Sequence, residues 1–377
     1  MSSHGGQPVG NLLLVGALLT AACSAPDVVS IDPSAGTGLE AELDRWLPRF
    51  MASARVPGVA VAILKDGEVV MSRGFGVRDA EGGDPVDGDT VFEAASLSKP
   101  MFAYAVLKLW EEGRIDLDVP LTSYLDEPYV DAEPRLEGIT ARRVLAHSTG
   151  FPNWRPAAWS DAPGPLTVDF EPGERFSYSG EGYVYLQRVV EKITDMPLAE
   201  FMGDRILVPL GMTRSSFVWV EDLASNAALG HGTDGQPITD RQRMTEGISA
   251  GSLYTTASDY AKFLTLMLAV EEPAPDDLTK ISGATLNSML ASETPIEGGL
   301  GWGLGWGLEP AVGAGFFWHW GDNGEFKAFT LGSMRDRAAV VVLTNSVFGL
   351  QICEPIVGAV IPRQHPAFGF RMVDYNY

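Results

Sequence analysis

The stretch VFEAASLSKPMFAYAVLKLWEEG, residues 91–113, places Ser96 three residues before Lys99 at the start of a predicted helix. Apolar side chains recur at helical spacing as far as Trp110, and Gly113 ends the helix. Because residues i and i+3 share a helix face, the hydroxyl and the amine lie within reach of one another. A serine hydroxyl becomes a good nucleophile only when a neighbouring base takes its proton. The pair therefore indicates either a nucleophile with its base or an ordinary surface helix, which often begins with serine and carries lysine.

The start of this helix has two features that would favour catalysis by a serine nucleophile. A lysine in a partly desolvated cleft beside other cations has a lowered pKa, so Lys99 could act as a base. The first backbone N–H groups carry the positive end of the helix dipole, which stabilises an oxyanion formed beside Ser96. The S-x-x-K pattern is nevertheless common by chance, so other segments must decide between the two interpretations.

Two later segments carry further candidates. In GERFSYSGEGYVYLQ, residues 173–187, Tyr178 precedes a predicted helix and could relay a proton if neighbouring cations depress its pKa. In FFWHWGDNGEF, residues 316–326, strand alternation places His319 on the face opposite its neighbouring tryptophans, so that it faces a cleft while they pack. Taken singly, each is better explained as a structural residue, a packing tyrosine and a hydrogen-bonded histidine.

Together and in this order, the three segments resemble the serine β-lactamase and penicillin-binding-protein superfamily. The resemblance is to its class C β-lactamase-like branch, which includes DD-peptidases and family VIII esterases and carries S-x-x-K, Y-x-N, and K-T-G or H-x-G. It runs from about residue 41 to 350 and includes VLAHSTGFPNW, ISAGSLYTTASDYAKFL and GLGWGL. It implies an α/β (α+β) fold of the β-lactamase/transpeptidase type: an antiparallel sheet flanked by helices, an inserted helical subdomain, and a cleft between them.

By position, the resemblance implies catalytic roles for four side chains. Ser96 would be the acylated nucleophile and Lys99 its base partner, while Tyr178 would shuttle protons between the nucleophile and the leaving group. His319 would take the place of the third-motif lysine and assist Tyr178. The backbone N–H groups of Ser96 and Asp322 would form the oxyanion hole.

Three neighbouring residues are expected to contact the substrate: Gly180, Trp320 and Gly321. Gly180 stands where β-lactamases commonly have an asparagine that contacts the acylamide side chain of the substrate. His319 stands where a lysine would keep its charge at neutral pH to hold a substrate carboxylate, whereas a histidine is only partly charged there. Both departures disfavour efficient β-lactam hydrolysis.

The resemblance therefore implies a serine hydrolase that forms an acyl-serine on an ester, amide or D-amino-acid peptide. Esterase or DD-peptidase activity is favoured over efficient β-lactamase activity. The alternative is a non-catalytic binding or scaffold protein of the cell envelope with the same fold, which the four intact motif side chains disfavour. In either case, we expect the ligand to be a small molecule or a peptide.

Other sequence patterns are weaker indications of function. GISAG, residues 247–251, matches G-x-S-x-G, but no buried strand precedes it and no helix follows at once, so Ser249 is expected to shape the cleft wall. The glycines of GLGWGLGWGLE do not form a dinucleotide-binding pattern. His147, in LAHSTG, is expected to make structural hydrogen bonds. We expect no metal and no cofactor, because no metal-ligand spacing occurs among the five histidines: His4, His147, His231, His319 and His365.

The composition excludes some partners. The chain has 377 residues and a formal net charge of −22, and a surface of that sign repels nucleic acid and anionic lipid headgroups. We therefore expect no nucleic-acid partner. The two cysteines, Cys23 and Cys353, do not form a disulfide framework, and Cys353 is expected to be a small buried apolar residue.

The first segment of the chain resembles an export signal. An apolar run from Leu12 to Leu19 is too short to span a bilayer and leads into TAAC, which resembles the lipobox of bacterial lipoproteins. Thr20, three residues before the cysteine, and the lack of Lys and Arg in MSSHGGQPVGN depart from that pattern. We expect a signal peptide over residues 1–23 and lipidation at Cys23 as the sole membrane attachment. The protein would then be an exported lipoprotein of the cell envelope, in the periplasm or on the outer surface of the membrane.

The remaining chain divides into three parts. Residues 24–38 are rich in Ser, Pro, Gly and Asp and are expected to be a flexible tether, followed by a hydrolase domain over 39–361 and a tail over 362–377. Strand-like segments occur at both ends of the domain, among them GVAVAILKDGEVVMSRGFG, residues 58–76, with its KDG hairpin signal. Helical patterns dominate 125–290. This order predicts one sheet built from both ends of the domain, with a helical subdomain inserted.

Overall fold

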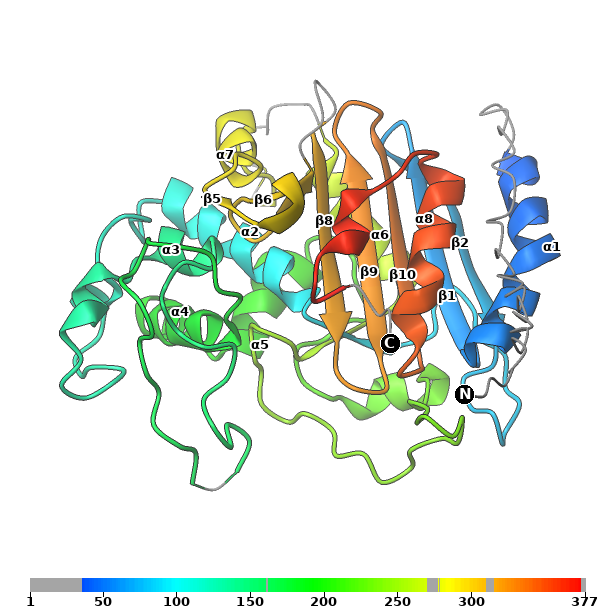
Figure 1. Ribbon diagram of the computed structural model, residues 1–377, viewed down its shortest axis with the longest axis horizontal. Coiled ribbons are helices and arrows are strands. Elements are labelled where there is room, and N and C mark those ends of the chain that lie inside the picture. The colour runs from blue at the N-terminus through cyan, green and yellow to red at the C-terminus, as the bar shows by residue number, and fades with distance from the viewer. Residues whose placement is uncertain (1–35, 161, 270–276, 278, 310–314, 374–377) are drawn as a thin grey trace, which may run out of the picture.

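The computed structural model describes residues 36–160, 162–269, 277, 279–309 and 315–373 (Figure 1). The predicted signal peptide, the predicted lipidation site Cys23, most of the tether and the last residues of the tail lie outside this part of the chain. Within it, no helix combines the length and the apolar character needed to cross a membrane.

An antiparallel sheet of eight strands forms the centre of the molecule (Figure 1). Its strand order is β2-β1-β10-β9-β8-β7-β6-β5, so the first hairpin lies beside the last strand, with Val59 opposite Thr344. The prediction that both ends of the domain build one sheet is therefore confirmed. The strands are β1 Gly58–Lys65, β2 Glu68–Gly76, β5 Thr294–Pro295, β6 Gly301–Trp302, β7 Gly307–Glu309, β8 Phe316–Asp322, β9 Lys327–Ser333 and β10 Ala338–Thr344.

Strand alternation gives this sheet two buried faces. On β1, Ala60 and Ala62 belong to one hydrophobic core, whereas Val59 and Val61 belong to the other. The first core includes side chains of α2 and α6, and the second includes side chains of α1 and α8. Cys353 begins α8 and is buried as a free thiol, as the sequence predicted. The four helices are α1 Gly36–Ala54, α2 Ser98–Glu111, α6 Ala257–Met267 and α8 Cys353–Val360.

A second, two-stranded antiparallel sheet pairs β3 Phe92–Ala95 with β4 Leu253–Thr255. Most of the remaining helices lie between these two strands in the sequence, as predicted. These are α3 Ala141–Leu145, α4 Gly180–Thr194 and α5 Leu198–Met202, with α7 Gly283–Met289 after β4. Single helical turns are η1 Leu121–Tyr124, η2 Pro134–Gly138, the π-helical η3 Gly203–Leu207, η4 Glu221–Asn226, η5 Glu297–Gly299, η6 Gly349–Ile352 and η7 Pro366–Gly369.

The junction between β3 and α2 sets the position of Ser96. Ala95 has a φ of 50°, a left-handed conformation that is uncommon for a residue other than glycine, and the chain turns there into the helix. Gly321 of β8 packs against this junction, because a Cβ atom at Gly321 would lie 2.4 Å from the carbonyl oxygen of Ala94. The absence of a side chain at Gly321 therefore brings the end of β8 beside the turn that carries Ser96.

Candidate active site

A buried lysine contacts the serine at the start of α2. The Nζ atom of Lys99 donates to Ser96 Oγ at 3.0 Å and to the carbonyl oxygen of Ala250 at 2.6 Å. Lys99 is 1% exposed, and it forms no ion pair within the described part of the chain. The predicted pair therefore exists, and its amine has no carboxylate to stabilise its charge.

Burial determines the protonation of Lys99. Desolvation lowers the pKa of its amine well below the ordinary value, because a cation loses more than a neutral amine on leaving water. The nearby aromatic rings of Tyr178 and Tyr183, 4.8 Å and 5.6 Å from Nζ, do not reverse this direction. The sequence predicted a lowered pKa caused partly by other cations, but the cause in the structure is desolvation.

Tyr178 lies at the start of α4, which anchors it. The Ser179 hydroxyl accepts from the N–H of Gly182 at 3.0 Å and donates to the carbonyl of Pro152 at 2.8 Å, so this helix start is capped. The Tyr178 hydroxyl is buried without a well-formed hydrogen bond in the described part of the chain. Burial raises its pKa, and the neighbouring Ser96 offsets only part of that rise. The condition for a depressed tyrosine pKa is therefore not met, and Tyr178 is a neutral phenol.

Two buried histidines near Tyr178 have opposite tautomers. His319 Nδ1 lies 2.6 Å from the carbonyl oxygen of Trp320, and a carbonyl only accepts, so Nδ1 carries the proton and Nε2 is an acceptor. His147 Nδ1 instead accepts from the N–H of Ser179 at 3.0 Å, so its proton is on Nε2. Both Nε2 atoms are buried without a partner among the described residues. The structural hydrogen bond expected of His147 is therefore present.

Burial also keeps both histidines uncharged. It lowers the pKa of His319 to about 3 and the pKa of His147 well below its usual range, with smaller contributions from Lys99. The centroid of the His319 ring lies 6.1 Å from that of Tyr178 and 5.2 Å from that of Trp320. The sequence predicted a partly charged histidine facing the cleft, and the structure corrects this. His319 is fully buried, whereas Trp320 lies on the pocket wall.

The last residue of β8 has a backbone N–H that does not point at β9. Asn323 donates its N–H to the carbonyl of Phe326 at 3.0 Å, so these two residues form a hydrogen-bonded pair across the β8–β9 ladder. Because such pairs alternate with pairs whose backbone groups point away from each other, the N–H of Asp322 points away from its ladder partner Lys327 and therefore away from β9. The carboxylate of Asp322 forms an ion pair with Lys327.

A network of polar groups joins β3 to the turn after β8. Arg241 donates to both carboxylate oxygens of Glu93 at 2.8 Å, to Glu325 at 2.5 Å and to the carbonyl of Asn323 at 2.9 Å. The Asn323 amide donates in turn to Glu93 at 2.9 Å and to the carbonyl of Gly251 at 3.1 Å. Sequence reasoning missed this network, because Glu93 and Arg241 are 148 residues apart and neither lies in a recognisable motif.

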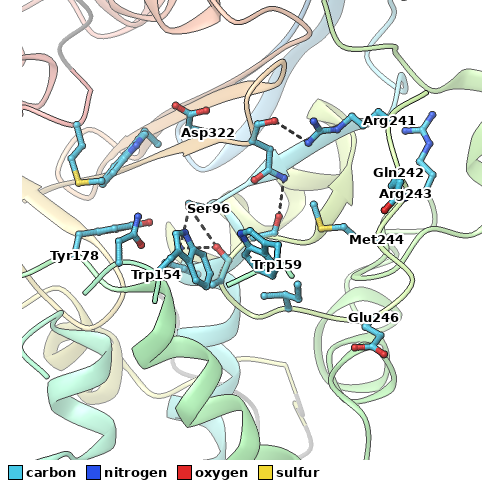
Figure 2. A pocket seen from close by; sticks show the side chains of 18 of the residues that line it. Ser96, Trp154, Trp159, Tyr178, Arg241, Gln242, Arg243, Met244, Glu246 and Asp322 are labelled. Atoms are coloured by element: carbon cyan, nitrogen blue, oxygen red, sulfur yellow. Dashed lines mark hydrogen bonds between the residues drawn. The ribbon is translucent and has the colours of Figure 1, made fainter. Parts of the chain in front are cut away.

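These groups surround a cavity of about 800 Å³ (Figure 2). That volume suits a small-molecule or short peptide ligand. Of the residues predicted to contact substrate, Trp320 lies on its wall, whereas Gly180 and Gly321 do not. The lining residues are Ser96, Lys99, Asn153, Trp154, Trp159, Tyr178, Arg241, Gln242, Arg243, Met244, Thr245, Glu246, Ile248, Ala250, Gly251, Trp320, Asp322, Asn323, Arg371 and Met372.

The competing candidates have structural roles. Ser249 is fully buried, donates its hydroxyl to the carbonyl of Tyr183 at 3.0 Å, and leaves its neighbours Ile248 and Ala250 on the cavity wall. The described residues contain no group of three or more His, Cys, Asp or Glu side chains that could hold a metal ion. Among these two serines, Ser96 is the one that lines the cavity and contacts a lysine.

Comparison with known proteins agrees with the geometry. The β-lactamase family model matches residues 43–351, so the chain belongs to the β-lactamase family. The predicted family is confirmed. The chain is similar to protein flp of Staphylococcus aureus, with 22% identity over 318 residues, 81% of this chain and 62% of the relative. It is also similar to esterase EstB of Burkholderia gladioli, with 31% identity over 257 residues, 61% of this chain and 62% of the relative. The chain thus spans about three fifths of the length of these curated relatives.

Solved structures share the fold. The octameric penicillin-binding protein homologue from Pyrococcus abyssi superposes with a TM-score of 0.71 and 26% identity, covering 87% of this chain and 79% of that one. A β-lactamase/D-alanine carboxypeptidase from Pseudomonas syringae superposes with a TM-score of 0.73 and 18% identity, covering 87% of this chain and 99% of that one. The predicted β-lactamase/transpeptidase-like fold is therefore confirmed.

Proposed function

We propose that this protein is a serine hydrolase that forms an acyl-enzyme on Ser96. The observation that carries the proposal is the 3.0 Å contact between Ser96 Oγ and Lys99 Nζ, in which the lysine is buried and its pKa is lowered. A neutral amine at this distance can accept the serine proton, which is what a weak alcohol nucleophile needs.

In the proposed acylation, each of these groups carries one step. Lys99 accepts the hydroxyl proton as Ser96 Oγ bonds to the substrate carbonyl carbon, and the N–H groups of Ser96 and Asp322 bind the oxygen that becomes negative. As the bond to the alcohol or amine breaks, Tyr178 gives its proton to the leaving group and receives the proton held by Lys99. His319, which is neutral, assists through its ring, whose centroid lies 6.1 Å from that of Tyr178.

Deacylation reverses the direction of proton transfer. Water attacks the acyl carbon and gives a proton through Tyr178 to Lys99, and the same two N–H groups bind the oxyanion again. The carboxylic acid is then released and Ser96 regains its proton from Lys99. The cycle consumes one ester or amide and one water and needs no metal or other cofactor.

We infer an ester, amide or D-amino-acid peptide as substrate, with efficient β-lactam hydrolysis disfavoured. A neutral His319 cannot hold a substrate carboxylate as a charged lysine would, and Gly180 offers no side-chain amide. The names of two similar proteins support this range, since one is an esterase and another a β-lactamase/D-alanine carboxypeptidase.

The proposal is tested by labelling the full chain with a fluorophosphonate and, separately, with a penicillin, and measuring intact mass. A stoichiometric adduct is expected on the wild type and on Ser249→Ala, but not on Ser96→Ala. Labelling by both reagents indicates a DD-peptidase-like site, and labelling by the fluorophosphonate alone indicates an esterase. No adduct on folded wild-type protein would contradict the nucleophile and favour a non-catalytic binding or scaffold protein.

We also propose export and lipid anchoring through Cys23, on the basis of the apolar run followed by TAAC. Metabolic labelling with radioactive palmitate in a bacterial host is expected to mark the wild-type protein and not Cys23→Ser. Equal labelling of both proteins, or of neither, would contradict lipidation at this residue.

A further inference from the structure

Gly180, two residues after Tyr178, lies directly beneath the indole ring of Trp154. A Cβ atom at Gly180 would lie 2.4 Å from Trp154 Cη2 and Cζ2 and 2.8 Å from Cε2, far inside ordinary van der Waals contact. The φ of Gly180 is not in the left-handed region, so the backbone itself does not require glycine. The indole ring is therefore what excludes a side chain at this position.

The segment that carries Trp154 is fixed to α4 on both sides of the ring. On one side, the backbone carbonyl of Asn153 accepts from Gly180 and Glu181 at 3.0 Å, and its side-chain oxygen accepts from Gly180 at 3.0 Å. On the other, Arg155 donates through Nε and Nη2 to Glu181 at 2.9 Å and 2.8 Å, and Glu181 is 4% exposed. Trp154 is thus held in place by backbone and charge contacts on both of its neighbours.

A second tryptophan extends this aromatic surface into the solvent. The Trp159 ring centroid lies 4.9 Å from that of Trp154, and both residues line the cavity that contains Ser96. Trp159 is 67% exposed, so much of its indole ring is accessible from the solvent side of the cavity. Figure 2 shows both indole rings beside Ser96.

We propose that Trp154 and Trp159 form a binding site for an aromatic group of the substrate, so that the natural substrate is an aryl or arylalkyl ester or amide. This inference rests on the proposed acyl-serine function. Rigid indole faces bind aromatic rings by offset or edge-to-face contact at little entropic cost. The Asn153 side-chain oxygen is engaged by Gly180, so at this end of the cavity the two indoles are accompanied by the Asn153 NH2 group, a hydrogen-bond donor.

Turnover of three esters tests the proposal: methyl phenylacetate carries the ring in the acyl part, benzyl acetate carries it in the alcohol part, and methyl acetate has none. Trp154→Ala is expected to lower kcat/KM about tenfold for at least one aromatic ester, and to change it less than about threefold for methyl acetate. Trp154→Phe keeps a ring and should restore most of the loss. Trp46→Ala, in α1 and away from the cavity lining, is the matched control.

The pattern across the two aromatic esters shows which part of the substrate the indoles bind. A loss confined to methyl phenylacetate places the acyl group there, and a loss confined to benzyl acetate places the alcohol there. An equal loss on all three esters, or no loss on either aromatic ester, would overturn the proposal.

Binding to Ser96→Ala separates this proposal from the proposed function. Calorimetry on that variant is expected to show tighter binding of an aromatic ester than of methyl acetate, and adding Trp154→Ala should remove the preference. If Ser96→Ala hydrolyses the esters as fast as the wild type, the nucleophile assignment fails. The loss of kcat/KM in Trp154→Ala on the aromatic esters relative to methyl acetate would then still decide whether the indole site exists, because that comparison does not depend on which residue is the nucleophile.

The contact between Gly180 and Trp154 has a test that does not involve substrate. Gly180→Ala is expected to lower the free energy of unfolding in the wild type but much less in Trp154→Ala, where the clash is gone. Equal losses in the two backgrounds would show that the ring does not exclude a side chain, and would overturn the first step of the inference.

Discussion

Arg241 forms a two-point ion pair with Glu93, with both guanidinium–carboxylate distances at 2.8 Å, and so fixes the strand that leads into Ser96. Glu93 is 2% exposed and lies three residues before Ser96. Asn323, next to the proposed oxyanion donor Asp322, binds both members of the pair. The pair therefore links the two segments whose N–H groups must point at one oxygen atom.

Glu93→Gln is expected to lower the free energy of unfolding by about 3 kcal/mol, because it deprives a partly buried guanidinium of its buried carboxylate partner. It should also lower kcat/KM, since the oxyanion donors lose their alignment and two residues of the cavity wall, Arg241 and Asn323, lose a shared partner. Denaturant unfolding and steady-state kinetics on one ester measure both effects.

Glu325→Gln is the matched control for that experiment. Glu325 also binds Arg241, but its side chain is 25% exposed, so its loss should cost less than about 1 kcal/mol. Equal effects of the two substitutions on stability and kcat/KM would contradict a special role for Glu93.

Local patterns in the sequence were sufficient to predict several elements. Asp66 and Gly67 form a two-residue turn with φ values of 54° and 82°, as the KDG signal between two apolar runs indicates. The S-x-x-K spacing placed Ser96 and Lys99 within hydrogen-bond distance, because helix geometry fixes residues three apart on one face. These predictions depend only on contacts between residues close in sequence.

Features that depend on long-range packing could not be predicted in this way. Alternation separates the two faces of β8, but it does not say whether a face is covered, so the complete burial of His319 was missed. The position of Trp154 over Gly180 depends on how the loop after α3 folds back onto α4. The pKa of Lys99 likewise depends on complete burial, which a single segment does not reveal.

Lys99 predicts a specific pH dependence of activity. Its pKa in the folded protein is lowered by burial, and only the neutral amine accepts the serine proton. The value of kcat/KM should therefore rise as the pH increases through the folded pKa of Lys99 and then reach a plateau well below the pH at which an exposed lysine titrates. A profile that continues to rise to about pH 10.4, the ordinary lysine pKa, would contradict this.

Lys99 also predicts a pH dependence of stability. The unfolded chain binds a proton at Lys99 below about pH 10.4, whereas the folded protein binds it only at lower pH, so this group destabilises the fold as the pH decreases toward its folded pKa. Lys99→Met removes that cost and all turnover. Its gain in unfolding free energy over the wild type should be largest at low pH, decrease as the pH rises, and vanish above about pH 10.4. A difference independent of pH would contradict the linkage.

The burial of His319 predicts a second pH dependence of the free energy of unfolding, in the acidic range. Burial lowers its folded pKa to about 3, while the unfolded chain protonates near 6.5, so stability is fully present above pH 6.5 and decreases as the pH falls toward 3. The decrease from this group is about 1.4 kcal/mol per pH unit within that window. His319→Gln should therefore lose less stability than the wild type between pH 7 and pH 4.5, as measured by urea unfolding. Parallel losses in both proteins would mean that His319 is not buried in its neutral form.

Tyr178→Phe separates the catalytic from the structural role of this tyrosine. The hydroxyl is buried without a well-formed hydrogen bond among the described residues, so its removal should leave the free energy of unfolding unchanged or slightly higher. The ring contacts with His147 and Trp320, at 4.2 Å and 4.7 Å between centroids, are retained. If the phenol transfers the proton to the leaving group, kcat should fall by about 10²-fold or more for an alkyl ester. The loss should be smaller for a 4-nitrophenyl ester, whose leaving group needs no proton. Equal losses on both esters would place Tyr178 in binding or alignment and not in proton transfer.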